Sequence, residues 1–346
     1  MKNNLLCLGF VLIFLSCGTS KTESEALKKD VFKNDFTIAF GSCNKHNVTN
    51  NLWDDILKTN PNLWIWGGDN IYGDTSNMEE LRSIYKAQNE VVGYKELKDK
   101  VPVIGIWDDN DYGQNDGGEE FEMKVESQQE FLDFMDVSKD NPRRSRKGIY
   151  AVHDYNLPKG KIKVLGLDTR YFRTALTKDT ETKKRNKPNT YGEGTILGKA
   201  QWQWLENELT NSDADFNIIV TSIQFLSNKH GFEAWGNFPH EVDRLNQLIT
   251  DSKAKGVIVL SGDRHISEFS KSEIDGVSYP LIDFTSSGLT HVYSNFSGEE
   301  NPYRVGEVVF TKSFGVLNID FKSNKVLFKM IGDNGKVLGE LEQVYK

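Results

Sequence analysis

The chain has 346 residues, of which 38% are apolar and 27% charged, a balance typical of a globular protein with one large domain or two smaller ones. The formal net charge of -8 argues against non-specific binding of nucleic acid through a basic surface. It leaves a phosphate-bearing substrate open, because bound metal ions can invert the local field.

The N-terminal segment 1–17 predicts a secretory signal of the lipoprotein type. Lys2 precedes an apolar stretch at 5–15, and Cys17 follows at the expected cleavage point, as in a bacterial lipobox. An ordinary signal peptide or an uncleaved anchor is the alternative, since Phe14 stands where leucine is usual. We expect export to the periplasm or cell envelope, with a lipid on Cys17 as the only membrane attachment. Residues 18–34 are predicted to be a polar tether, and 35–346 a monomeric folded domain.

Apolar runs alternate with amphipathic stretches from residue 36 onward. Strands are predicted at 36–40, 63–66, 101–106, 163–167, 217–222 and 256–260. Helices are predicted at 78–88, 119–134, 199–210 and 240–251. This alternation favours an α/β layered fold. The tail differs, because its runs predict antiparallel strands at 307–310, 315–321, 325–331 and 337–344. The charged segment 177–190 is predicted to be a solvated loop.

Several predicted strands end in side chains that can bind metal. Ligands gather at the carboxyl ends of strands in open α/β sheets, so these residues are expected to converge. Singly, each has a simpler interpretation, such as a small buried cysteine or a carboxylate that caps a turn. Cys43 is the only cysteine of the predicted domain, which therefore cannot form an internal disulfide. The candidate ligands are Cys43, Asp69, Tyr72, Asp109, Gln224, Asp263 and His265.

Six motifs give these residues a family context. They are Phe-Gly-Ser-Cys at 40–43, Gly-Asp-Asn-Ile-Tyr-Gly-Asp at 68–74, Trp-Asp-Asp-x-Asp-Tyr-Gly at 107–113, Leu-Asp-Thr-Arg-Tyr-Phe-Arg at 167–173, Ser-Gly-Asp-Arg-His at 261–265 and Thr-Ser-Ser-Gly-Leu-Thr-His at 285–291. In number and order they resemble the alkaline phosphatase D family of calcineurin-like, purple-acid-phosphatase-like metallophosphoesterases. The resemblance implies a four-layer α/β-β/α sandwich with antiparallel C-terminal strands.

The resemblance also implies a dinuclear metal centre. Cys43, Asp69, Tyr72 and His265 would hold the first metal, with Asp69 bridging to the second. Asp109 and Asp263, together with Gln224, would complete the second site. The family implies Fe(III) with calcium; the residues alone indicate hard or borderline ions, with magnesium or manganese also suited to the second site.

Such a centre predicts hydrolysis of phosphate monoesters, diesters or both. Two cations clamp a phosphoryl group and lower the pKa of a bridging water, whose hydroxide attacks phosphorus. Arg170 is expected to grip phosphate oxygens, as guanidinium groups do in pairs of hydrogen bonds. Arg173 is expected to pair with a surface acid, and Asp168 to orient its neighbours from a buried position.

Asn110 departs from the family pattern, which has histidine at this catalytic position. An amide can donate a hydrogen bond to phosphate but cannot supply a proton to the leaving oxygen. Weak turnover of esters with poor leaving groups follows, unless His46 or His291 supplies the acid. A protein that binds phosphate esters with little turnover is therefore the alternative function. The seven Trp and twelve Tyr raise a third, carbohydrate processing, but Trp64 and Trp66 are expected in the core.

Overall fold

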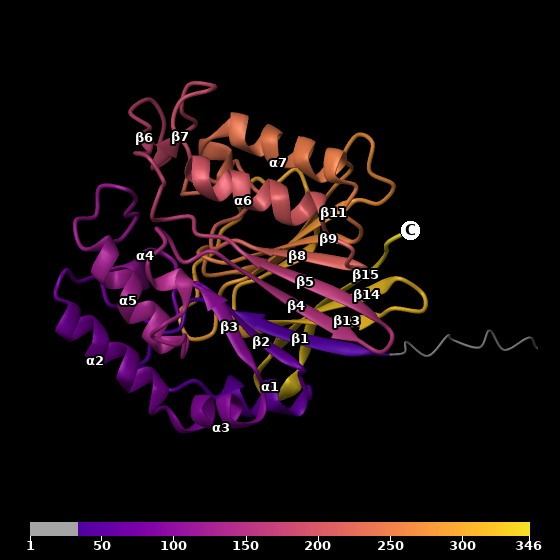
Figure 1. Cartoon of the computed structure of the whole chain (residues 1–346), viewed down its shortest axis with the longest axis horizontal. Helices are drawn as coiled ribbons and strands as arrows, with labels where there is room; N and C mark the ends of the chain where they lie inside the picture. The colour runs from indigo at the N-terminus through magenta and orange to yellow at the C-terminus, as the bar shows by residue number, and fades with distance from the viewer. Residues whose placement is uncertain (1–33) are drawn as a thin grey trace, which may run out of the picture. The chain divides into compact units, whose positions relative to one another are not determined.

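The computed structural model describes residues 34–346, which form two large mixed sheets with helices outside them (Figure 1). The predicted signal segment, Cys17 and the tether up to residue 33 lie outside the described residues. None of the helices in residues 34–346 combines the length and the apolar character needed to cross a membrane. The α/β sandwich predicted from the sequence is confirmed by this arrangement of sheets and helices.

The first sheet has the strand order β15-β14-β13-β1-β2-β3. Strands β1 to β3 are parallel, whereas β13 to β15 form an antiparallel meander that joins the sheet at β1. The predicted antiparallel tail is therefore confirmed. The strands are β1 (Phe36–Gly41), β2 (Leu63–Gly67), β3 (Val103–Ile106), β13 (Ser313–Asp320), β14 (Lys325–Gly332) and β15 (Val337–Val344).

The second sheet has the order β12-β10-β11-β9-β8-β5-β4. Its centre is parallel, and antiparallel strands complete both edges. The sequence did not predict β4, β10 or β11, because polar residues interrupt their apolar character. The strands are β4 (Ala151–Leu157), β5 (Gly160–Gly166), β8 (Phe216–Val220), β9 (Val257–Ser261), β10 (Ser267–Ser272), β11 (Leu281–Ser286) and β12 (Arg304–Val309).

Helices α1, α2, α3 and α5 lie on the side of the first sheet, and α6 and α7 on the side of the second (Figure 1). Helix α5 begins five residues later than predicted, because the backbone N–H of Glu119 donates to Arg173 O (2.8 Å) and not into a helix. The α-helices are α1 (Leu52–Lys58), α2 (Met78–Asn89), α3 (Val92–Lys100), α4 (Asp109–Tyr112), α5 (Lys124–Phe134), α6 (Gly198–Thr210) and α7 (Pro239–Ser252). Short 3₁₀ turns lie at Pro142–Arg144, Trp235–Asn237 and Asp333–Gly335.

Aromatic side chains fill both the space between the sheets and the space under the helices. Phe40 of the first sheet meets Phe284 of the second edge to face, with ring centroids 4.9 Å apart. On the outer side, Trp64 and Trp66 of β2 pack against Trp53 of α1, at 5.7 and 5.6 Å. Both β2 tryptophans are fully buried, as predicted, so they are core residues and not an exposed platform for sugars.

The segment 177–190 is largely exposed, as its charge predicts, but it is not an irregular loop throughout. It contains a small two-stranded sheet, β6 (Thr177–Lys178) and β7 (Asn186–Lys187). The Asn186 N–H donates to Gly231 O at 2.8 Å, which fastens the hairpin to the loop after β8. The hairpin was not predicted because local composition does not report a long-range backbone hydrogen bond.

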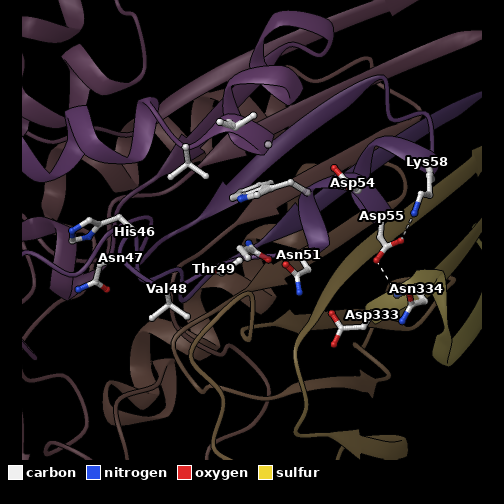
Figure 2. A pocket seen from close by; sticks show the side chains of 15 residues that line it. His46, Asn47, Val48, Thr49, Asn51, Asp54, Asp55, Lys58, Asp333 and Asn334 are labelled. Atoms are coloured by element: carbon white, nitrogen blue, oxygen red, sulfur yellow. Dashed lines mark hydrogen bonds and ion pairs between the residues drawn. The ribbon is translucent and has the colours of Figure 1, made fainter.

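A cavity of about 790 Å³ opens beside α1, and Figure 2 shows its polar lining. His46 and Asn47 lie at one end, and Lys58 at the other, where it pairs with Asp55 at 2.9 Å. None of the seven candidate metal ligands lines this cavity. The candidate chemistry therefore lies elsewhere in the described part of the chain.

Candidate metal centre

Loops at the carboxyl ends of strands from both sheets meet at one edge of the sandwich. A backbone bridge between Ser42 and Ser287 joins the two sheets there. Gly68 permits the close approach: its φ is +99°, and a Cβ at this position would lie 2.7 Å from Cβ of Asp108. The convergence expected from the strand ends is thus present.

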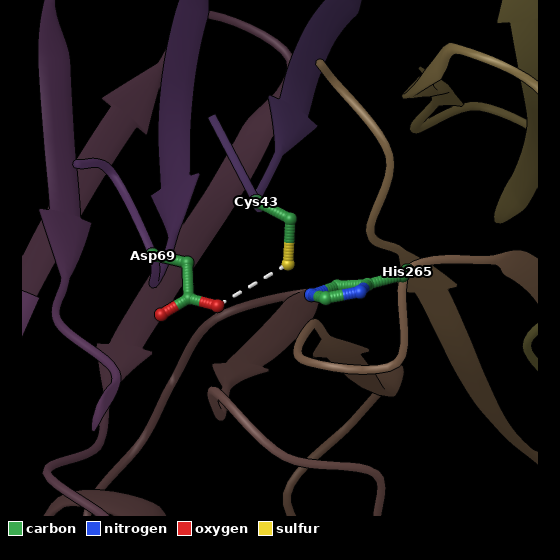
Figure 3. Close-up of side chains that lie close together, drawn as sticks. All are labelled: Cys43, Asp69 and His265. Carbon is green, nitrogen blue, oxygen red and sulfur yellow. Dashed lines mark hydrogen bonds between the residues drawn. The ribbon is translucent and has the colours of Figure 1, made fainter. Parts of the chain in front are cut away.

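Four candidate ligands of the first metal lie together. Figure 3 shows Cys43, Asp69 and His265 pointing toward one another, and their ligand atoms lie within 4.8 Å of each other. Cys43 Sγ is 3.3 Å from Asp69 Oδ2. The Tyr72 hydroxyl is 3.4 Å from the same oxygen and 3.1 Å from His265 Nε2. One thiol, one phenol, one imidazole and one carboxylate therefore surround a common point.

A second cluster shares Asp69 with the first. Its carboxylate lies within the same 4.8 Å limit of those of Asp108, Asp109 and Asp263. Asp69 therefore occupies the place that the resemblance implies for a bridging ligand. Asp108 was not among the candidate ligands predicted from the sequence. The short helix α4, which begins at Asp109, was not predicted either, so the sequence contained no signal for Asp108.

Two buried oxygen atoms near the centre are left without hydrogen bonds within the described residues. Asp108 receives its hydrogen bonds on Oδ1, from Arg170 Nε and Ser222 Oγ at 2.6 Å each, while Oδ2 has none. Gln224 donates through Nε2 to Glu268 and Thr285 at 2.8 Å, while its Oε1 has no donor. Buried acceptors are normally satisfied, so the free oxygen of Asp108 beside the clustered carboxylates fits a cation. The side-chain hydrogen bonds of Gln224 go to Glu268 and Thr285 and not to residues of either cluster.

The electrostatics of the centre also fit a cation. Burial and then the neighbouring carboxylates raise the pKa of Asp69 well above its usual range. Burial likewise raises the pKa of Asp263 to about 7. Burial and then the charge of Asp69 raise the pKa of the Cys43 thiol. Acids in this position repel one another when ionised, and a metal would remove that repulsion. The mixed donor set suits iron-type ions, and the all-oxygen set suits calcium, magnesium or manganese.

Four candidate ligands have left-handed backbone. Their φ values are 58° for Cys43, 50° for Asp69, 65° for Asp263 and 57° for His265. This region costs a residue with a side chain roughly 1–2 kcal/mol, and glycine would adopt it freely. The centre therefore concentrates backbone strain, a feature common at functional sites.

Arg170 is buried behind the second cluster and is already paired. Its guanidinium contacts Asp108 at 2.5 Å and Glu233 at 2.6 Å. Arg173 is also buried and contacts Glu233 at 2.8 Å, so the prediction that it pairs with a surface acid was wrong. Asp168 is the buried orienting residue that was predicted, and it accepts hydrogen bonds from Trp107 Nε1 (2.9 Å) and Ile149 N (2.8 Å).

Asn110 places its amide against two carboxylates of the second cluster, one of which is the shared Asp69. Nδ2 donates to Asp69 Oδ1 and to Asp109 Oδ1, at 3.0 Å each. His291 adjoins the first cluster, with Nδ1 3.1 Å from the Tyr72 hydroxyl and its ring 4.0 Å from that of His265. His46, the other acid considered from the sequence, lines the separate cavity of Figure 2.

A cavity of about 280 Å³ lies directly over the centre. Its wall includes candidate ligands of the second metal and His265, two arginines and two exposed aromatic rings, together with Asn110, Asn115, Asp116 and Glu233. The lining residues that the argument uses are Asp109, Asp116, Arg185, Phe232, Asp263, Arg264, His265 and Tyr293.

Solved structures share this fold. One described as the structure of PhoD superposes with a TM-score of 0.73 at 18% identity, over 91% of this chain and 69% of that one. A dimetal phosphatase from Danio rerio gives 0.58 at 12% identity, over 91% and 100% of the two chains. GAP50, described as the anchor in the inner membrane complex of Plasmodium, gives 0.59 at 14% identity, over 91% and 90%. At these identities the likeness concerns the fold.

Sequence comparison is more specific. Alkaline phosphatase D of Bacillus subtilis (strain 168) is 24% identical over 73% of this chain and 51% of its own length, so the chain spans about half of that relative. The sequence pattern of the PhoD-like phosphatases matches residues 38–323, which include every candidate ligand. The chain belongs to the PhoD-like phosphatase family.

Proposed function

We propose that this chain is an exported, metal-dependent phosphoesterase that hydrolyses phosphate monoesters, diesters or both at a dinuclear centre. The observation that carries the proposal is the sharing of Asp69 by two ligand clusters under one cavity. Family membership supports it, and so does the relative named alkaline phosphatase D, although the chain spans about half of that relative.

In this proposal Cys43, Asp69, Tyr72 and His265 hold iron. Asp69, Asp109, Asp263 and Gln224, joined by Asp108, hold calcium, magnesium or manganese. When bound, the two metals polarise the phosphoryl group, supply a nucleophile from water at neutral pH and neutralise the charge that develops. The soft and borderline donors on one side and oxygen donors on the other support two different ions.

The remaining residues of the site orient the metal ligands and limit the size of the substrate. Asn110 donates both amide N–H groups to Asp69 and Asp109, so it orients these carboxylates and carries no proton for the leaving oxygen. Arg170 is engaged on Asp108 and Glu233, so we assign it a positioning role toward Asp108 in place of direct phosphate binding. The substrate is a small or slender phosphate ester, because the cavity over the centre holds about 280 Å³.

A second candidate function is binding of phosphate esters with little turnover. The observation that favours it is Asn110, whose amide bonds to carboxylates on both sides and supplies no acid. The complete set of clustered ligands favours catalysis instead. Turnover of an ester whose leaving group needs no proton separates the two.

The test combines metal analysis with turnover by the purified chain. We expect iron and a second metal, a phenolate-to-iron absorption band, and hydrolysis of an aryl phosphomonoester or aryl phosphodiester. Asp69→Asn should lose most of the metal and the activity, whereas Asp54→Asn, an exposed acid at the separate cavity of Figure 2, should retain both. Bound metal without turnover on either ester would favour the binding function. A protein that binds no metal would contradict both candidate functions.

Export is the remaining part of the proposal, with a lipid on Cys17. The signal pattern at 1–17 supports it. In a bacterial host, Cys17→Ser should move the protein from the membrane fraction to the soluble fraction. Equal distribution of the variant and the wild type would contradict lipidation.

A further inference from the structure

The hairpin β6–β7 forms one wall of the cavity over the metal centre. Besides the bond from Asn186 to Gly231, the Asn189 N–H donates to Asn237 O at 2.8 Å. Lys184 lies against Gly231, where an added Cβ would meet its side chain. These contacts hold the hairpin beside the cavity, so its side chains have defined positions there.

Arg185 is the hairpin residue that lines the cavity. One of its nitrogens contacts Asp116 Oδ2 at 2.7 Å, and its side chain remains 49% exposed. The Asp116 N–H in turn donates to Asp109 Oδ2 at 2.7 Å, so Arg185 lies one residue away from the second ligand cluster. A guanidinium carries five N–H donors, and contact through one nitrogen leaves donors for a ligand in the cavity.

Arg264 is the other arginine of the cavity and differs in how it is held. It stands between Asp263 and His265 in the chain, both candidate ligands. Its side chain is only 7% exposed, contacts both oxygens of Glu299 at 2.7 and 2.9 Å, and stacks over Phe232 at 4.1 Å. This fixed cation is next to the metals, where the reacting phosphoryl group would lie. Arg185 is the more exposed cation, on the side of Asp116.

The charge of the hairpin is opposite to that of the protein. Residues 177–187 contain five basic and two acidic side chains, a net +3 in a chain of net charge -8. Basic groups at the mouth of a cavity attract anions and hold those that carry more than one charge more strongly. A substrate with a single phosphate would leave this feature without a function.

We propose that Arg185 binds a second anionic group of the substrate, beyond the phosphoryl group held at the metals. The preferred substrate is then a phosphate ester that carries another phosphate or a carboxylate near the reacting one, and the hairpin β6–β7 is its specificity element. This inference rests on the proposed function, because it assigns the first phosphoryl group to the metal centre.

The test measures binding of three small anions that cannot be hydrolysed. Methylphosphonate carries one anionic group, phosphonoacetate adds a carboxylate, and methylenediphosphonate adds a second phosphonate. Titration calorimetry with the metal-loaded protein should show tighter binding of the two doubly anionic ligands. Arg185→Ala should weaken both about tenfold, as for the loss of charge-assisted hydrogen bonds, and methylphosphonate less than threefold. A larger effect of Arg185→Ala on methylenediphosphonate would identify the second group as a phosphate. A larger effect on phosphonoacetate would identify it as a carboxylate.

Two control variants separate contact from general charge. Lys183→Ala removes the same charge from the same hairpin at an exposed position outside the cavity lining, and should change each affinity less than twofold. Arg185→Lys keeps the charge but loses the planar fork, and should give intermediate affinities. Equal weakening of all three ligands by Arg185→Ala would overturn the inference, since Asp116, left with only the distant Lys178 at 3.9 Å, would then repel every anion. Equal effects of Arg185→Ala and Lys183→Ala would overturn it as well.

Failure of the proposed function would give a different result. None of the three anions is hydrolysed, so their relative affinities do not depend on turnover. A protein that binds metal and prefers the doubly anionic ligands, but hydrolyses neither aryl ester, would contradict catalysis and support the assignment of Arg185.

Discussion

Asn110 has the clearest consequence among single residues, because it contacts the shared Asp69 and Asp109 and cannot transfer a proton. A general acid contributes about 10²–10⁴-fold to the breaking of a bond to a poor leaving group. We therefore predict that Asn110→His raises kcat/KM for an alkyl phosphate at least tenfold. An aryl phosphate, whose leaving group departs without a proton, should change much less. Steady-state kinetics with both esters, at equal metal content, measure the ratio of kcat/KM between Asn110→His and the wild type for each ester.

The matched control for this prediction is Asn110→Ala. It removes the hydrogen bonds to Asp69 and Asp109 without adding an acid, so it should not raise the rate on the alkyl ester. If Asn110→His leaves that rate unchanged, another residue protonates the leaving oxygen. His291 would be the next to test, because it contacts Tyr72 at 3.1 Å.

The convergence of candidate ligands could be predicted from the sequence because a strand end fixes where a side chain points. Cys43, Asp69 and His265 follow separate strands and still meet within 4.8 Å. Asp109 was predicted and Asp108 was not, since the short helix α4, which brings both carboxylates to one centre, gives no signal in the sequence. Arg185 gave no signal either, because long-range contacts such as the bond from Asn186 to Gly231 bring its hairpin to the cavity.

At the scale of elements, β8 and β9 of the second sheet contain continuous apolar runs and were predicted, whereas the mixed strands β4, β10 and β11 were not. β9 reads Val-Ile-Val-Leu-Ser and is buried along its whole length. β10 reads Ser-Glu-Phe-Ser-Lys-Ser, yet its first four residues are buried, because Glu268 pairs with Arg304 at 2.7 Å and Ser267 bonds to Ser313 at 3.0 Å. Such pairs are long-range contacts that local periodicity does not contain.

Helix α7 provides a prediction at the same scale. It ends at Lys253, an exposed residue with a φ of 55° in the left-handed region. Glycine is the usual residue at such a helix end, since it adopts this conformation without steric cost. Lys253→Gly should raise the free energy of unfolding by about 1 kcal/mol. Chemical denaturation of both proteins measures the difference.

Lys253→Ala is the control for this prediction. It removes the same long charged side chain but retains the Cβ that causes the strain, so it should give no comparable gain in stability. If alanine stabilises the protein as much as glycine does, the benefit comes from the loss of the lysine charge and not from the backbone.

For the molecule as a whole, the metals should contribute to stability as well as to chemistry. Asp69, Asp108, Asp109 and Asp263 lie within 4.8 Å of one another, and a bound cation replaces their repulsion by attraction. A ligand at a hundredfold excess over its Kd stabilises a fold by about 2.7 kcal/mol. Chelation should therefore lower the Tm by about 5 °C or more, and metal should restore it. Differential scanning fluorimetry measures both changes.

The variant Asp69→Asn serves as the control for chelation. It lacks the carboxylate shared by both clusters, so a chelator should shift its Tm much less than that of the wild type. A similar shift in both proteins would place the stabilising metal at another position.

The contact between the two sheets makes the free energy of unfolding depend on pH in a way that is separate from the metal centre. His153 of β4 lies at a small cavity whose wall includes Ile65 and Ile104 of the first sheet and Val164 of the second. Burial, and then the charge of Arg143, lower the pKa of His153 to about 4, from 6.5. The folded state therefore resists protonation of this imidazole, which the unfolded chain accepts freely.

The sign of the effect follows from this direction. A histidine with a lowered pKa in the folded state contributes its full stability above pH 6.5 and loses it as the pH falls toward 4. Between pH 7 and pH 5 the loss should be about 2 kcal/mol. Denaturant unfolding at both values should show this loss in the wild type beyond that of His153→Gln, because the carboxylates of the metal centre titrate in both proteins and cancel in the comparison. An equal fall in the two proteins would mean that His153 is protonated without cost, and that the joint between the sheets is open to water.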